Sequence, residues 1–349
     1  MYCKNGKIQI LSLALISVYF GIAVCLLTMA GCSFTGGPRA RMGYLPTATS
    51  GIRFPHPDKL GTHGYGFNLS EVGGIVYTCK GGHIDLDHVR GNADDTRYLV
   101  KLIRGTLSKK SKGFSFKLTG ERSRHLVSFD YPANWDNLPD KTAVIDDIAF
   151  STAPYLAFNA TTWHEIQTWF GVHFALIEPE FNSAFSWEDI YSNLLGTIIG
   201  AEAVQDTKRK YNEAVTFAIY RHLQKLDVQP KAAAIAASDK MRGQWYTGNF
   251  VPDMRMRNFD IGLDGYVTPT LVPGIGECND VPLELPVPTT DTLKRYGISM
   301  THQIKPNVLV QGKMFRVAGS KKIYPEIHFP IMIDYMKQQA IKKRYKYTD

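Results

Sequence analysis

The first 32 residues constrain this chain most strongly, because they decide how much of it is left to fold. Lys4 and Lys7 precede a run from Ile8 to Leu27 that contains no Asp, Glu, Lys or Arg, and Met29-Ala30-Gly31 then leads into Cys32. A basic start, an apolar stretch and small residues before a cysteine are typical of a lipoprotein signal peptide (residues 1–31), with Cys32 as the lipidation site. The alternative is an uncleaved transmembrane anchor, since about 20 apolar residues span a bilayer.

Either alternative places the rest of the chain beyond the cytoplasmic membrane. Ser33, and not Asp, follows Cys32, which favours a bacterial cell-envelope lipoprotein anchored in the outer membrane and facing the periplasm. The formal net charge of +8 is modest, and its basic residues are not organised as a nucleic-acid-binding patch. We therefore expect the membrane, through the N-terminal lipid, as a partner, and no nucleic acid.

The remaining chain divides by composition into three parts. Removal of residues 1–31 from the 349 leaves 318 residues, enough to bury a large core. Residues 32–60 are rich in Gly, Pro, Ser and Thr and suit a flexible tether. We expect one globular domain over 61–335 and a basic tail over 336–349, which includes the run Lys342-Lys343-Arg344.

Two cysteines remain once the signal is removed and Cys32 is acylated. Cys79 and Cys278 would then lie in a compartment that oxidises paired thiols. A disulfide between them is one interpretation. Two buried free thiols, or Cys79 as a nucleophile beside a glycine turn, are the others.

Periodicity along the chain predicts a mixed fold. Residues 73–78 have the pattern of a strand, and Asp94 is a suitable cap for a helix from about 95 to 107. Alternating apolar residues predict a hairpin of 114–118 with 125–129. The pattern is then helical, and the last third returns to extended segments punctuated by proline. We predict an α+β fold with a helical middle, an antiparallel hairpin and irregular extended segments at both ends; the predicted helices of the middle are 155–171, 187–204, 209–226 and 230–242.

The densest polar cluster lies between His83 and Asp95. His83, Asp85, Asp87 and His88 follow a glycine turn, and such a set of imidazoles and carboxylates can hold a divalent metal ion. The alternative is a capped loop in which Arg90 pairs with Asp85 or with Asp94.

A second candidate is Glu165, which stands between Trp163 and Trp169 on a predicted helix. The His164-Glu165 pair is similar to the start of a zincin motif, but Thr168 occupies the position of the second histidine. Burial beside tryptophans raises the pKa of a carboxyl group and suits a general acid or base. Equally, Glu165 can form a buried ion pair, with Arg90 or His88 as the partner.

A third candidate is the pair Ser192 and Asn193, inside an otherwise apolar helix. Buried polar side chains need hydrogen-bond partners, so we expect these two to support a site on a neighbouring element.

Together these segments resemble a bacterial envelope lipoprotein family, described as domain of unknown function 4056. The resemblance implies a lipid-anchored bacterial protein and no particular activity. It gives more weight to His88, Arg90, Asp94 and Glu165 than to His83 and His164. The residues that carry it are Tyr77-Thr78-Cys79, Gly81-Gly82, Ile84-Asp85, His88, Arg90, Asp94, Glu165, Thr168-Trp169, Gly171, Phe185-Ser186, Glu188-Asp189, Tyr191 to Gly196, Arg257-Asn258, Asp260 and Gly262.

These observations lead to a site hypothesis in which His88, Arg90, Asp94 and Glu165 form one pocket, supported by Ser192 and Asn193. In the leading interpretation the chain is a lipid-anchored envelope protein that carries this pocket. If it is an enzyme, the expected class is hydrolase: His88 or Glu165 activates water, and Arg90 binds an anionic group or a developing oxyanion. His88 and Glu165 are also the candidate ligands of a divalent metal cofactor. An envelope polymer is the expected substrate, by location alone. The rival interpretation is a non-catalytic envelope binding or assembly factor.

Overall fold

The structure is a computed structural model. It describes residues 37–41, 43–48, 53–118, 123–171, 173–174, 178–179, 183–249, 252–306 and 311–349. The predicted signal peptide and Cys32 therefore lie outside the described residues. Within the described ranges, no helix combines the length and the apolar character needed to cross a bilayer.

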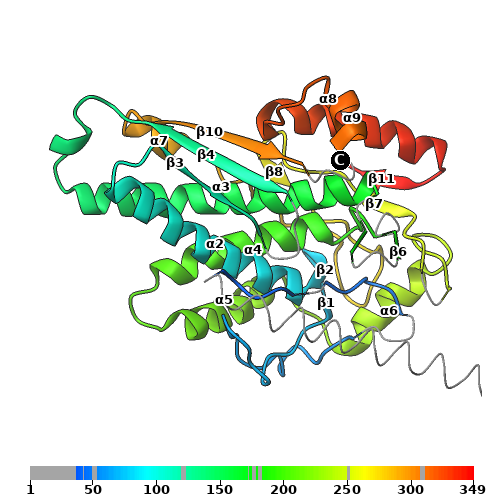
Figure 1. The fold of residues 1–349 in the computed structure, drawn as a ribbon. Helices are drawn as coiled ribbons and strands as arrows, with labels where there is room; N and C mark the ends of the chain where they lie inside the picture. The colour runs from blue at the N-terminus through cyan, green and yellow to red at the C-terminus, as the bar shows by residue number, and fades with distance from the viewer. Residues whose placement is uncertain are drawn as a thin grey trace, which may run out of the picture.

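Long helices form the middle of the molecule, as the periodicity predicts. Helix α2 packs against both α3 and α4, and α5 packs against α4 (Figure 1). The structure confirms the α+β class and the helical middle. The bounds are α2 Leu86–Ser108, α3 Lys141–Trp169, α4 Asp189–Gln205, α5 Tyr211–Lys225 and α6 Lys231–Met241, with a short 3-10 helix η2 at Trp135–Asn137.

Two glycines allow α2 and α4 to pack closely. A Cβ atom on Gly196 would lie 2.5 Å from the carbonyl oxygen of Val89, and one on Gly200 would lie 2.7 Å from that of Ala93. Real Cβ atoms do not approach backbone so closely. Because glycine has no side chain, α2 and α4 can approach each other closely at these two positions. These two helices carry most of the candidate site residues.

The sheets are small and mostly antiparallel. Strands β1 (Ile75–Thr78) and β2 (Gly82–Asp85) form a hairpin whose tight turn contains Gly82 at φ +67°. The predicted second hairpin is confirmed: β3 (Gly113–Phe116) pairs with β4 (Arg124–Asp130), and β10 (Ser299–Lys305) adds a third strand to β4.

Helix α2 begins earlier than the sequence predicts. The expected start was near Asp95 with Asp94 as the cap, but the helix begins at Leu86 and its N-cap is Asp85. The Oδ1 atom of Asp85 accepts from the backbone N–H groups of Asp87 and His88. Gly91, in the second turn of the helix, weakens the helical pattern there, and packing against α4 outweighs that propensity.

The last third is more helical than the extended pattern predicted. Helix α9 is 18 residues long although Pro330 lies inside it, because buried Phe329, Met332, Ile333 and Met336 pack on the core. The residues assigned to a basic tail continue α9 and then form β11. The remaining bounds are β5 His173–Phe174, β6 Glu178–Pro179, β7 Met256–Asn258, β8 Tyr266–Val267, β9 Leu285–Pro286, α7 Asp291–Arg295, α8 Gln311–Ala318, α9 Pro325–Lys342 and β11 Lys346–Thr348, which lies parallel to β7.

A disulfide joins Cys79 to Cys278, which lie 199 positions apart in sequence, with 5.0 Å between their Cα atoms. The bond ties the end of the β1–β2 hairpin to the loop that precedes β9. Cys79 is therefore not a free thiol in this structure, and the interpretation as a nucleophile does not apply to it.

Candidate functional site

The site begins at the junction of β2 and α2, where Asp85 stands in a buried position. Its carboxylate caps the helix, an arrangement favoured by the unpaired N–H groups and the positive end of the helix dipole. The Oγ atom of Ser192, on α4, accepts a 3.0 Å hydrogen bond from the backbone N–H of Asp85. This geometry fixes the first turn of α2 and the position of His88 within it.

His88 pairs with a carboxylate from α4. Its Nδ1 atom lies 3.4 Å from Oδ1 of Asp189 and 3.9 Å from Oδ2 of Asp85. The His88 side chain is 25% exposed, whereas both carboxylates are buried. Nδ1 makes no hydrogen bond to either acid, so both contacts are close approaches of possible charges. A partly accessible imidazole beside buried acids is an arrangement that can move protons.

Asp189 belongs to a group of buried acids at the start of α4. The Oδ2 atom of Asp189 accepts hydrogen bonds from the backbone N–H and the hydroxyl of Ser186, and Oε1 of Glu188 lies 2.8 Å from the same hydroxyl. Burial raises the pKa of Asp189, and the nearby charge of Glu165 raises it further. Burial and the charge of Asp189 raise the pKa of Glu188 in the same way.

Glu165 approaches this group from α3. Its Oε2 atom accepts a 2.9 Å hydrogen bond from the backbone N–H of Phe185, a residue in the left-handed region at φ +56°. The predicted burial of Glu165 is therefore correct. Arg90, one of the two predicted partners, contacts Glu71 and the carbonyl oxygen of Leu60.

A buried cation lies beside the acids. The guanidinium of Arg257, from β7, donates to the carbonyl oxygen of Ala184 and lies 3.9 Å from Asp253. The charge of Asp189 also acts on it, but more weakly than that of Asp253. Burial lowers the pKa of Arg257. The positive charge beside Asp189 is consistent with a site for an anionic group or for negative charge that develops during a reaction.

Asn193 joins α4 to α2, as expected of a supporting residue. Its Oδ1 atom accepts a 2.7 Å hydrogen bond from the side-chain amide of Asn92, which also donates to the carbonyl oxygen of His88. Ser192 and Asn193 therefore hold the helix that presents His88, and they do so through backbone and amide groups.

Arg90 and Asp94 lie in a different cluster. They are two and six residues after His88, and a rotation of about 100° per residue places both on another face of α2. Asp94 receives an ion pair of 2.5 Å from Arg41 and a contact of 2.9 Å from Nε2 of His63. Arg90 lies 3.7 Å from Glu71 and donates to the carbonyl oxygen of Leu60. The structure thus divides the predicted pocket in two.

The second cluster is a buried network of paired charges. Burial by itself would raise the pKa of Glu71, but Arg41 and Arg90 lower it to about 2. Burial lowers the pKa of His63 in spite of its contact with Asp94. Opposite charges meet throughout this network, so it joins the early part of the chain to α2.

An N-terminal strap, residues 37–41 and 43–48, crosses both clusters. Arg41 reaches the second cluster, and the backbone N–H of Tyr44 donates to Oδ2 of Asp85 in the first. Gly43 lies directly over His88: a Cβ atom at this position would overlap Nε2 of the imidazole and would lie 3.0 Å from Oδ2 of Asp85. The strap therefore covers the ring nitrogen that faces away from Asp189.

The metal hypothesis receives no support from the described residues. Among them, no three His, Cys, Asp or Glu side chains are grouped in a way that could hold a metal ion. His83, the other histidine of the predicted metal loop, is a core residue: its Nδ1 accepts from the indole N–H of Trp187, and burial lowers its pKa to about 4.

Sequence reasoning missed the buried acids at the start of α4, of which Asp189 contacts His88. Glu188 and Asp189 have the pattern of a helix start, Ser-Trp-Glu-Asp, which explains acidic residues by capping alone. The sequence did not reveal that these acids are buried. They are buried because α2, α3 and α4 pack together at this point.

Comparison with known proteins agrees with the resemblance in the sequence. The family model described as Protein of unknown function (DUF4056) matches residues 59–273, which is more than half of the chain. The chain therefore belongs to this family. No curated protein and no solved structure matches it. His88, Glu165, Asp189 and Arg257 lie inside the matched range, and the strap lies outside it.

Proposed function

We propose that this chain is a hydrolase of the bacterial cell envelope, with His88 as the general base. The observation that carries the proposal is the pairing of Nδ1 of His88 with Asp189 in a buried group of acids. When Asp189 is ionised, its charge near Nδ1 favours the tautomer with the proton on Nδ1, and Nε2 can accept a proton once the strap has moved away from it. Nε2 can then remove a proton from a water molecule that attacks a substrate.

The neighbouring acids supply the complementary function. Burial raises the pKa of Asp189 and Glu188, so a proton is held in this group more readily than on exposed carboxyl groups. Environments that separate the protonation states of neighbouring groups are typical of acid–base sites. Arg257 would stabilise developing negative charge, the role that the sequence had suggested for Arg90.

The envelope location rests on the N-terminal sequence. The apolar run and Cys32 support a lipid anchor, with Ser33 favouring the outer membrane and a periplasmic orientation. Peptidoglycan is then the first substrate to test, because it is the abundant polymer of that compartment.

One observation favours the rival function, a non-catalytic binding or assembly factor. Gly43 packs on Nε2 of His88, so the strap must move before a substrate can reach the base. In an assembly factor the strap would stay in place, and the acids would serve to hold α2, α3 and α4 together.

The deciding experiment compares the full chain with a variant at the base. Purified protein is incubated with peptidoglycan, with phospholipid vesicles and with a simple ester, and soluble products are measured by mass spectrometry. We expect His88→Gln to lower product release by about 100-fold or more, since general bases contribute about that much. His56→Gln, at an exposed histidine, is the matched control. Absence of products from the unmodified chain, or equal release by folded His88→Gln, would refute the proposal.

A further inference from the structure

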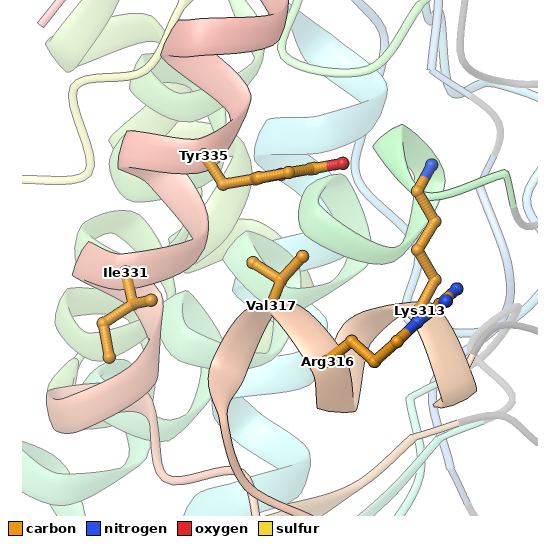
Figure 2. A pocket seen from close by; sticks show the side chains of 5 residues that line it. All are labelled: Lys313, Arg316, Val317, Ile331 and Tyr335. Carbon is orange, nitrogen blue, oxygen red and sulfur yellow. The ribbon is translucent and has the colours of Figure 1, made fainter.

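A surface groove lies between α8 and α9, and its lining shares no residue with the His88 site. It has a volume of about 650 Å³ and is lined by Lys313, Arg316, Val317, Ile331 and Tyr335. Figure 2 shows that the cationic ends of Lys313 and Arg316 and the hydroxyl of Tyr335 lie toward one end, with Val317 and Ile331 toward the other. The groove therefore has a cationic end and an apolar end.

Apolar side chains continue along the outward side of α9. Ile327 is 60% exposed, Ile331 is 43% exposed and Ile341 is 54% exposed. The helical period of 3.6 residues places these three within about 80° of one another around the axis, with exposed Asp334 and Gln338 between them. Exposed isoleucines at such spacing on one helix are a feature of surfaces that meet an apolar phase.

The surrounding charge is strongly positive. Residues 311–349 contain nine lysines and arginines and three acids, a net charge of +6 out of the +8 of the whole chain. Two of those acids have partners: Glu326 accepts from the hydroxyl of Tyr155, and Asp349 pairs with Lys337. Within the described part of the chain, Arg316, Lys321, Lys322 and Lys342 form no ion pair. The cations of this face are thus available to an external anion.

We propose that the face formed by α8 and α9 binds the surface of a bilayer that contains anionic phospholipid. Phosphate groups would meet Lys313 and Arg316, and the isoleucines of α9 would enter the boundary between head groups and acyl chains. Charge complementarity selects this occupant over a second copy of the chain, because a symmetric contact would bring the same cations together. The inference depends neither on hydrolase activity nor on lipidation of Cys32.

The position of the face also allows a contact of this kind. Figure 1 shows α8 and α9 on one side of α3, with α5 on the other side. Tyr335 is held in place by stacking on Phe170, at 5.7 Å between ring centroids, so the groove is built on the end of α3 rather than on a loop. A rigid face is suited to a planar surface.

Photo-crosslinking tests the proposal in the full chain. Ile331 is replaced by the photo-reactive p-benzoylphenylalanine, and the protein is mixed with vesicles of equal parts phosphatidylglycerol and phosphatidylcholine, or of phosphatidylcholine alone. We expect lipid adducts at position 331 with the anionic vesicles, and at least about five-fold fewer with phosphatidylcholine alone. The same reagent at Phe217, exposed on α5, should give no such difference between the vesicles.

Charge variants complete the test. Lys313→Gln with Arg316→Gln should lower the adduct yield at 331 by roughly 25-fold, because each basic residue near an anionic surface contributes about five-fold to binding. Lys208→Gln with Lys231→Gln, at exposed lysines elsewhere, should leave it unchanged. Equal yields on both kinds of vesicle, crosslinks to a second copy of the chain, or no adduct at all would each overturn the proposal.

Discussion

His88 and Asp189 meet across two helices, with 3.4 Å between Nδ1 and Oδ1, although 100 residues separate them in sequence. The Oδ2 atom of Asp189 holds the turn before α4 through Ser186, and Oδ1 is the oxygen that faces His88. Asp85 already caps α2, so His88 is not needed for that role. A buried acid with a raised pKa beside a titratable partner is typical of functional sites.

The first prediction concerns Asp189→Asn. The amide keeps an oxygen that can accept from Ser186 but removes a charge from a buried group of acids. We expect the free energy of unfolding at pH 8 to stay within about 1 kcal/mol of the unmodified value or to rise, and product release to fall by about 100-fold. Thermal unfolding and product assays measure both, with Asp58→Asn, at an acid that is 83% exposed, as control. Loss of the fold in Asp189→Asn would show that the acid is structural.

Glu165 can be tested with two substitutions of similar size. Glu165→Gln retains an oxygen for the N–H of Phe185, whereas Glu165→Leu leaves that buried donor unsatisfied. An unsatisfied buried donor costs about 1–3 kcal/mol, so we expect Leu to be destabilising by this amount and Gln to be nearly neutral. Urea unfolding measures the difference. If both variants unfold at the same urea concentration, the hydrogen bond to Phe185 does not hold this turn.

Gly43→Ala tests whether the strap lies on His88. The new Cβ atom would overlap Nε2 of His88, so the strap must shift away from α2. We expect faster hydrogen exchange at the amides of Arg39, Arg41 and Tyr44, and faster product release under the proposed function. Gly66→Ala is the matched control, because a Cβ atom there has open space. Unchanged exchange in Gly43→Ala would mean that the strap does not press on the imidazole.

Two glycine-to-alanine substitutions on α2 and α4 should change the free energy of unfolding in opposite directions. Gly196→Ala should destabilise the protein by roughly 2 kcal/mol, since its methyl group would meet the backbone at Val89. Gly91→Ala, on α2 with open space around it, should stabilise by about 0.5–1 kcal/mol through helix propensity. Chemical denaturation checks both. Stabilisation by both alanines would show that the two helices are not in close contact.

The raised pKa of Asp87 predicts that the free energy of unfolding depends on pH. Burial, and then the charge of Asp85, raise the pKa of Asp87 from 3.8 to about 6. A carboxyl group with a raised pKa in the folded state contributes stability at low pH and loses it as the pH rises from about 4 to 6. This shift in the pKa of Asp87 corresponds to roughly 3 kcal/mol in the free energy of unfolding.

Asp87→Asn removes this titration while an amide oxygen can still accept from the N–H of Gly74. We expect the variant to be more stable than the unmodified chain at pH 8 and similar at pH 4, as measured by urea unfolding across this range. Asp58→Asn, at an exposed acid, should leave the stability unchanged at both pH 8 and pH 4. An unaltered pH profile in Asp87→Asn would assign the dependence to other acids.

Local patterns were sufficient for much of the fold. Alternating residues located the β3–β4 hairpin, and helical periodicity located α4, α5 and α6, because backbone hydrogen bonding in these elements joins residues close in sequence. Burial of Glu165 could also be inferred, since tryptophans flank it on the same helix. The helices at the C-terminus were missed, because prolines at positions 325 and 330 obscure a pattern that core packing maintains.

The sequence by itself determined the α+β class, the order of the central elements and the residue types of the site. Only the tertiary structure decided which of those residues meet. It placed His88 with Asp189 and Glu165, and it placed Arg90 and Asp94 with the strap and Glu71. The physical reason is that the face of a helix on which a side chain lies is a local property, whereas the partner opposite that face comes from a distant segment. That partner is selected by the packing of the whole core.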